Sequence, residues 1–229
     1  MRDTFKLFMI LTLLLAASGC GGDDDSSSSS NAASNTSSAS NDTSGADTGM
    51  TEADTGTTEA DVDDRACPGD PGEPYGTSEG SNFLPFTFDD CDGNPYAFYG
   101  EAEGYCETSF TVVSIAGGWC GPCRIEAELM QEQLVEAYAD QNVRVIVAII
   151  QDNDFGVPDS GFCEGWASQY GLTNPVLLDP FQETSVYFPG GALPATLIVD
   201  SNGVIVHREY GVSDELATVR AKLDQLLSE

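Results

Sequence analysis

The chain has 229 residues and a formal net charge of −30, with eight lysines and arginines against 38 aspartates and glutamates. A surface this acidic repels a phosphate backbone, which argues against nucleic acid as a partner and predicts a solvated protein that we expect to be a monomer. Once the non-globular segments are set aside, the length leaves room for one folded domain.

Residues 1–19 have the pattern of an export signal. Two basic residues come before an apolar run at 7–17, which is too short to cross a bilayer comfortably, and Ser18 and Gly19 come before Cys20. This ending resembles the lipobox of bacterial lipoproteins, in which the cysteine is lipidated, although Ala17 stands where such boxes usually have leucine. The resemblance implies a lipoprotein signal peptide and attachment to a lipid bilayer through Cys20. The alternative is an ordinary secretory signal with an incidental cysteine.

The segment after the signal has the composition of a linker. Residues 20–64 consist mainly of Ser, Thr, Asn, Asp, Gly and Ala and contain almost no large apolar side chain. Such a segment cannot bury a core, so we predict a disordered tether. A lead arm at 65–82 follows, in which prolines and glycines punctuate the chain after Cys67, and we expect it to pack on the domain in an extended form.

From residue 83 to residue 229 the sequence alternates strand and helix patterns. Apolar runs at 110–115 and 143–150 are typical of buried strands, and the apolar spacing between them predicts a helix from about Pro122 to about Asp140, so that the three form a βαβ unit. The other expected elements are an edge strand at 83–88, a helix at 162–170, a loop carrying 177–180, strands at 195–199 and 204–207 joined by a turn at 201–203, and a last helix capped by Ser213. This order predicts an α/β fold with a central mixed β-sheet flanked by helices.

The motif Trp119-Cys120-Gly121-Pro122-Cys123 lies where the first buried strand meets the long helix. At a helix N-terminus the free amide groups and the helix dipole favour a thiolate, so Cys120 is the predicted nucleophile. Cys123 is one turn further into the helix, and we expect it to resolve the mixed disulfide by attacking Cys120. Pro122 suits the first helical turn because its missing N–H has no partner there.

Two other interpretations of the cysteine pair remain. A static disulfide is not excluded by the pair alone, although the strand before it and the helix after it are typical of a redox motif. A zinc site needs two more ligands, and the single histidine, His207, stands alone on a predicted strand, where we expect a surface residue. We therefore predict neither a metal nor a cofactor.

These residues resemble the thioredoxin superfamily, and most closely the TlpA/ResA-like redoxins of bacterial envelopes. The resemblance covers about residues 83–227 and depends on the motif at 119–123 and on Leu193-Pro194-Ala195-Thr196 followed by 197–203. It implies a thioredoxin-like domain at 83–229, in which Pro194 is cis and faces the cysteine pair and the backbone at Leu193 pairs with the substrate chain. Trp119, Gly121 and Pro122 then line the substrate site.

Glu126 follows Cys123 by three residues and so lies on the same helix face. It matches a glutamate that TlpA/ResA-like proteins keep near the cysteines, where partial burial would let it accept the proton of Cys123. The alternative is an exposed helix carboxylate. The chain departs from its relatives at Glu128, where most have a helix-kinking proline, and at Ser114, where thioredoxin has a buried acid.

Two functions from different classes fit the sequence. The first is a membrane-tethered thiol-disulfide oxidoreductase of the bacterial cell envelope, which exchanges disulfides with exported proteins and draws on an upstream membrane dithiol donor. The second is a non-catalytic, disulfide-stapled surface lipoprotein that acts as a binding module. The direction of electron flow and the identity of the substrate are open.

If Cys20 carries lipid, four cysteines outside the motif are left to form structural disulfides. We expect Cys91 to pair with Cys106, because a hairpin-like return would bring them together across about 16 residues. By elimination, Cys67 then pairs with Cys163 and pins the arm. Alternatives for Cys163 are a small buried residue or a third redox thiol.

Overall fold

The computed structural model describes residue 67 and residues 69–229. The expected signal peptide, the lipidation at Cys20 and the tether lie outside these residues. Among the helices of the described part, none has both the length and the apolar character needed to cross a bilayer.

The described residues form one mixed sheet with its strands in the order β2-β1-β5-β4-β3-β6-β7. The strands are β1 Thr87–Asp90, β2 Pro95–Ala97, β3 Phe110–Ala116, β4 Val143–Ile149, β5 Val176–Leu178, β6 Ala195–Asp200 and β7 Ile205–Tyr210. The helices are α1 Gly121–Met130, α2 Ser160–Tyr170 and α3 Ala217–Leu227, with a π-helical segment at Gln131–Glu136 and short 3₁₀ turns at Tyr105–Glu107, Glu183–Tyr187 and Asp214–Leu216. The predicted α/β fold with a central mixed sheet and flanking helices is confirmed.

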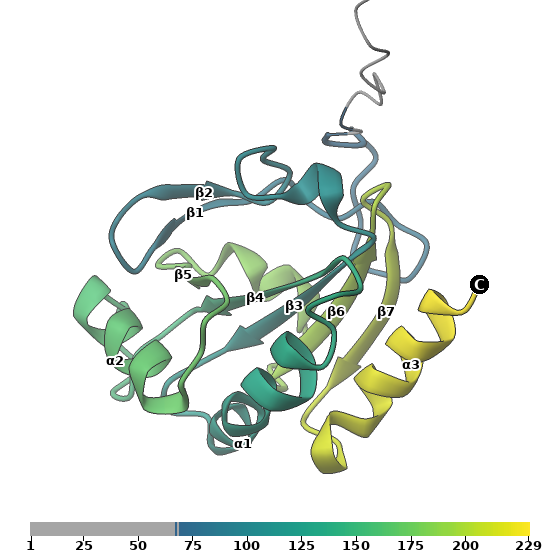
Figure 1. The fold of residues 1–229 in the computed structure, drawn as a ribbon. Helices are drawn as coiled ribbons and strands as arrows, with labels where there is room; N and C mark the ends of the chain where they lie inside the picture. Colours follow the sequence, from purple (N-terminus) through teal and green to yellow (C-terminus); the bar gives the residue numbers. More distant parts are fainter. Residues whose placement is uncertain (1–66, 68) are drawn as a thin grey trace, which may run out of the picture. The chain divides into compact units, whose positions relative to one another are not determined.

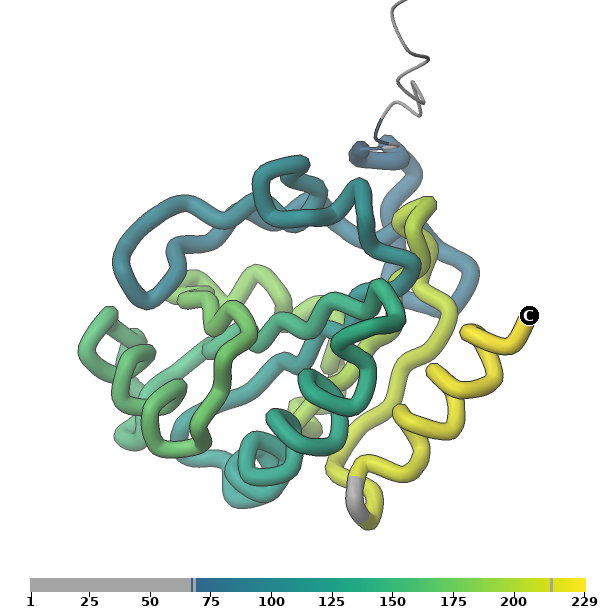
Figure 2. The backbone as a smooth tube through the Cα atoms, viewed as in Figure 1, coloured from purple at the N-terminus to yellow at the C-terminus, as the bar shows by residue number. Residues whose placement is uncertain are grey.

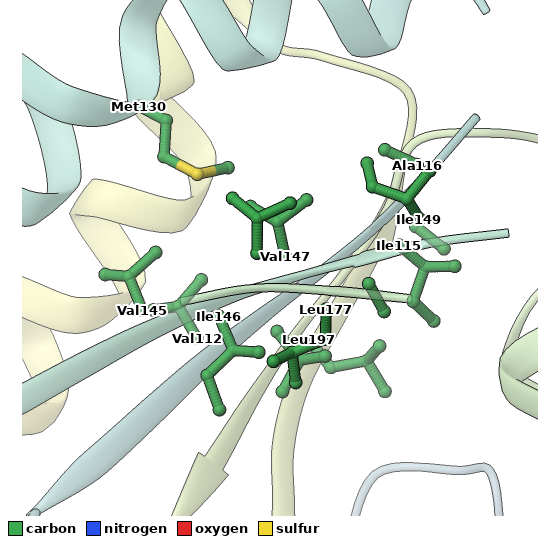
Figure 3. Close-up of a cluster of buried hydrophobic side chains, with 14 of the residues drawn as sticks. Val112, Ile115, Ala116, Met130, Val145, Ile146, Val147, Ile149, Leu177 and Leu197 are labelled. Atoms are coloured by element: carbon green, nitrogen blue, oxygen red, sulfur yellow. The ribbon is translucent and has the colours of Figure 1, made fainter. Parts of the chain in front are cut away.

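The centre of the sheet is buried on both faces. β3 pairs in parallel with β4 and antiparallel with β6, so successive side chains of β3 point alternately to the two faces. Figure 3 shows Met130 of α1 and Val147 on one side of the strands, and Ile146 and Leu197 on the other. Because neither face is open to water, these strands are near-continuous apolar runs, which is why the sequence marks them so clearly.

Different elements cover the two faces. Figure 1 shows α1, α2 and α3 along one side of the sheet. On the other face, Phe83, Phe86 and Phe98 pack against Val113 and Ile146 of the central strands. Phe83 also stacks on Tyr187, with ring centroids 4.8 Å apart. The first apolar residues of the domain therefore build the second half of the core.

The lead arm lies along the free edge of β7, as Figure 2 shows. Gly80 N–H donates to Ile205 O at 2.8 Å, and Ile205 N–H donates to Ser81 O at 2.9 Å. A disulfide joins Cys67 to Cys106. The arm thus gains backbone pairing and a covalent link that its small apolar surface could not replace.

Several predicted boundaries are wrong. The first strand begins at Thr87 and not at residue 83, and the loop expected around 177–180 contains β5. The long helix leaves α-helical geometry after Met130, and Ser213 precedes a 3₁₀ turn, so α3 begins only at Ala217. The Ser213 hydroxyl still accepts from Thr218 N–H at 3.2 Å.

The predicted pairing of the structural cysteines is also wrong. Cys67 pairs with Cys106, and Cys91 pairs with Cys163. β1 pairs with β5 as well as with β2, in a register that sets Asp90 opposite Leu177. This register carries Cys91 toward α2, which immediately precedes β5, and away from Cys106.

Candidate active site

The cysteine pair lies at the junction of β3 and α1, as the sequence predicts. Cys120 is the N-cap of α1, with extended backbone (φ −80°, ψ 111°), and its Sγ accepts a hydrogen bond from Cys123 N–H at 3.1 Å. Pro122 occupies the first turn. The two sulfurs form a disulfide. A thiolate at Cys120 would keep the amide donor of Cys123 and the positive end of the helix dipole.

The pair is shielded from solvent. Cys120 is 4% exposed and Cys123 is 1% exposed, so both residues are nearly enclosed. Gly121 and Pro122 are exposed between them. A partner must therefore contact the surface around the motif before its sulfur reaches Cys120.

Pro194 stands at the same end of the sheet as the motif. The register of β3 with β6 sets Ile115 opposite Ala195, so Pro194 falls beside the point where β3 leads into the motif. The Leu193–Pro194 peptide bond is cis, as the resemblance implies. Leu193 and Pro194 are both buried, and Pro194 O accepts from Gly211 N–H at 2.8 Å.

Glu126 lies inside the protein beneath the motif. Its side chain is 2% exposed, so the alternative of an exposed helix carboxylate is wrong. Ser114 Oγ donates to one carboxylate oxygen at 2.7 Å, and Thr196 Oγ1 donates to the other at 2.7 Å. Burial raises the pKa of Glu126 to about 7, although the two hydroxyl hydrogen bonds act in the opposite direction. A carboxyl group one turn from Cys123 can therefore change protonation state near neutral pH.

The strand residue Ser114 accounts for the departure from thioredoxin. Where thioredoxin places an acid, this chain places a hydroxyl that holds an acid from the facing helix. Ser114 and Thr196 are directly opposite each other on β3 and β6, so both reach the same carboxylate. The buried acid is thus supplied by α1 instead of by β3.

A second acidic group lies near Glu126, and sequence reasoning missed it. Glu209 of β7 is opposite Thr196, and its negative charge raises the pKa of Glu126 further. Partial burial raises the pKa of Glu209 itself, while the neighbouring His207 acts against this. His207 lies on the edge strand β7, as expected, but it is only partly exposed, at 17%, and lies 3.6 Å from both Glu209 and Glu79. Alternation along β7, which sets residues 207 and 209 on one face, was the available sequence pattern.

The loop after β4 also contributes to the site, which sequence reasoning missed. Trp119 Nε1 donates to Gln151 Oε1 at 3.1 Å, and the Trp119 ring stacks on Phe155 with ring centroids 4.9 Å apart. The run of polar residues and glycine around Phe155 predicts a turn, but no local pattern says that the turn folds back onto the motif.

Among the described residues, no group of three or more His, Cys, Asp or Glu side chains is arranged to hold a metal ion. The chemistry that the described site itself offers is that of two thiols and a buried carboxyl group.

Comparisons with known proteins agree with this geometry. A family model described as Redoxin matches residues 79–227. Thiol-disulfide oxidoreductase ResA from Bacillus thuringiensis (strain Al Hakam) and ResA from Bacillus anthracis are each 30% identical over 95 residues, which cover 42% of this chain and 51% of each relative. The chain therefore spans about half the length of these curated relatives.

Solved structures show the same fold. A thiol:disulfide interchange protein of the thioredoxin family from Chlorobium tepidum TLS is 14% identical with a TM-score of 0.52, and the match covers 66% of this chain and 98% of that one. A thiol:disulfide interchange protein from a Bacteroides species is 14% identical with a TM-score of 0.53, covering 66% of this chain and 91% of that one. The thioredoxin-like fold is thereby confirmed.

Proposed function

The chain belongs to the redoxin family, and from this premise we propose that it is a thiol-disulfide oxidoreductase that works through Cys120 and Cys123. The observation that carries the proposal is the position of Cys120, whose sulfur caps α1 and accepts the amide hydrogen of Cys123. A purely structural disulfide has no need of this position. At a helix N-terminus it activates one sulfur of the pair over the other.

The exchange proceeds in two steps. In the first, the Cys120 thiolate attacks one sulfur of a client disulfide, forms a mixed disulfide with it and releases the other client sulfur as a thiolate. In the second, the Cys123 thiolate attacks Cys120 Sγ and releases the remaining client sulfur. The client gains two electrons and two protons, and the pair is left as the Cys120–Cys123 disulfide seen in the structure. A dithiol donor reverses these steps to reduce the pair again, and an oxidising partner would run the cycle in the opposite direction.

Glu126 is proposed as the proton acceptor for Cys123. The resolving thiol is buried and must lose its proton before it attacks, and Glu126 is the buried carboxyl group one turn away on the same helix face. A pKa of about 7 suits a group that must take up and release a proton near neutral pH. Ser114 and Thr196 hold the carboxyl group in place.

The site of action and the partners form the finer part of the proposal. The pattern of residues 1–64 supports export, lipidation at Cys20 and a flexible tether, which would place the domain in the bacterial cell envelope. Its clients would then be exported proteins with cysteine thiols or disulfides, and its donor a dithiol protein of the membrane. The two further disulfides agree with an oxidising compartment.

Single cysteine variants test the proposal. Cys120→Ala should abolish reduction of insulin disulfides, whereas Cys123→Ala should accumulate covalent mixed disulfides that a reducing agent releases. Both variants keep the remaining disulfides as an internal control, which is checked by peptide mapping without reduction. Full insulin reduction by both variants would refute the proposed mechanism.

A further inference from the structure

The loop between β4 and α2 is fastened to the redox motif. Gly118 N–H donates to Gln151 O at 2.8 Å, and Arg124, which directly follows Cys123, donates to Asn153 Oδ1 at 3.0 Å. A Cβ atom on residue 118 would lie 2.7 Å from the carbonyl carbon of Asp152 and 2.8 Å from Asn153 N. Glycine at this position therefore allows the loop to approach the motif, and the hydrogen bonds hold the loop against it.

Hydrogen bonds inside the loop set the direction of Phe155. Asp152 Oδ1 accepts from Asp154 N–H at 2.8 Å and from Gly156 N–H at 2.7 Å, while Gln151 Nε2 donates to Phe155 O at 2.9 Å. Phe155 has φ 64°, in the left-handed region that a bulky residue seldom adopts. The loop thus holds one aromatic side chain in an uncommon conformation.

The Phe155 ring lies flat against the motif and faces solvent. It stacks on the Trp119 ring at an interplanar angle of 20°, and Phe155 is 62% exposed. Gln151 links the two residues, because its amide accepts from Trp119 Nε1 and donates to Phe155 O. A buried core gains little from a ring in this position, since most of its apolar surface stays in water.

We propose that Trp119 and Phe155 form an aromatic platform on which a cysteine-bearing, extended client segment places a large apolar or aromatic side chain next to its cysteine. The inference depends on the proposed function and names the class of client that this site prefers. Trp119 directly precedes Cys120, so the platform begins one residue, about 3.8 Å between Cα atoms, from the cysteine that attacks the client.

The surroundings favour this occupant over others. Cys120 is nearly enclosed, so an approaching client must contact the adjoining surface, and the exposed apolar ring beside the pair is available for that contact. Asp154 is exposed next to Phe155 and would repel an anionic lipid surface. An aromatic client side chain gains both burial and stacking on the Phe155 ring, and a branched apolar side chain gains burial.

The test compares two peptides that differ at one residue. Each is an extended peptide whose single cysteine carries a mixed disulfide with nitrothiobenzoate, and the next residue is phenylalanine in one and serine in the other. Attack by Cys120 of the reduced protein forms the protein–peptide disulfide and releases coloured nitrothiobenzoate. Hydroxyethyl disulfide, which has no side chain to dock, measures the intrinsic reactivity of the pair.

Phe155→Asn removes the ring but keeps a residue that tolerates the left-handed region. It should slow attack on the phenylalanine peptide about threefold to tenfold, the range expected for the loss of one aromatic pair. The serine peptide and hydroxyethyl disulfide should react at unchanged rates. Phe155→Tyr should behave as the natural protein, and so should Phe181→Ala, which removes a side chain that is 84% exposed in another loop.

Two results would overturn the platform while leaving the proposed function in place. One is that the wild-type protein reacts with both peptides at the same rate. The other is a Phe155→Asn variant that slows both peptides and hydroxyethyl disulfide equally, which would mean that Phe155 only supports Trp119. A natural protein that fails to react even with hydroxyethyl disulfide would refute the proposed function, and the platform with it.

Discussion

Replacing Glu126 by glutamine should remove a pH-dependent loss of stability from the oxidised protein. The carboxyl group is buried, and burial raises its pKa in the folded protein from an ordinary value of 4.5 to about 7. This difference corresponds to about 3 kcal/mol of folding free energy at about 1.4 kcal/mol for each pKa unit. Glutamine has nearly the same shape and can still accept a hydroxyl hydrogen bond, so the variant mainly removes the charge.

The sign of the effect follows from proton binding. Between pH 4.5 and about pH 7 the folded protein holds a proton on Glu126 that the unfolded chain has already lost. The free energy of unfolding therefore falls as the pH rises through this window, and the contribution is constant below and above it. At pH 8 the natural protein should have lost about 3 kcal/mol relative to pH 4 through this group alone, and Glu126→Gln should show no such loss.

Urea unfolding of the oxidised protein at several pH values from 4 to 8 measures this difference. The oxidised form is chosen because its cysteines do not titrate. Glu128→Gln is the matched control, since it removes an exposed carboxyl group from the same helix. If natural protein and Glu126→Gln show parallel curves, the carboxyl group is not buried as described, and its proposed part in proton transfer loses its basis.

Three further changes have defined outcomes. Thr196→Val removes a hydroxyl donor that lowers the pKa of Glu126. The pH above which the free energy of unfolding stops falling should therefore move upward in the same urea experiment. Replacing Cys91 and Cys163 together by alanine opens a loop of 72 residues and should cost about 4 kcal/mol in the chain-entropy model, read from the urea midpoint; an unchanged midpoint would contradict it. Gly118→Ala should displace the 151–156 loop and quench or shift Trp119 fluorescence, and an unchanged spectrum would contradict the close approach described.

The sequence was sufficient for the parts of the fold that have local patterns. β3, α1, β4 and β6 are predicted to within a few residues at most boundaries because their apolar runs and spacings follow from burial on both faces of the sheet. The position of Cys120 at the start of a helix is equally local, since a buried strand ends and a helical pattern begins around it. These are the features on which the resemblance to redoxins also depends.

The environment of Glu126 could not be decided from the sequence. A glutamate three residues after Cys123 is compatible with a buried or an exposed helix face, because the apolar pattern of α1 leaves both open. The environment depends on two hydroxyl groups, those of Ser114 on β3 and Thr196 on β6. These two residues are 82 residues apart in the sequence. Only the antiparallel register of β3 and β6 sets them side by side.

The failure to predict β5 and the wrong disulfide pairing have the same cause. A run of three residues, Val176–Leu178, is too short to be distinguished from an apolar loop by periodicity, yet it pairs with both β4 and β1. Cys91 Sγ lies 3.6 Å and Cys163 Sγ 3.4 Å from the same carbonyl oxygen, that of Val176. Without β5 nothing draws Cys91 toward α2, and a hairpin return to Cys106 is the natural expectation.

The corrected pairing also changes what the disulfide does for the site. The Cys91–Cys163 disulfide fixes the N-terminal turn region of α2 to the end of β1. Phe162, the residue before Cys163, lies so close to Gly118 that a Cβ there would be 2.5 Å from its ring. The disulfide therefore helps to hold α2 against Gly118, the residue at which the 151–156 loop approaches the motif. A disulfide between Cys163 and the arm would not have linked α2 to the sheet near the contact of Phe162 with Gly118. The observed disulfide links α2 directly to the end of β1, and so supports the contact beside the 151–156 loop.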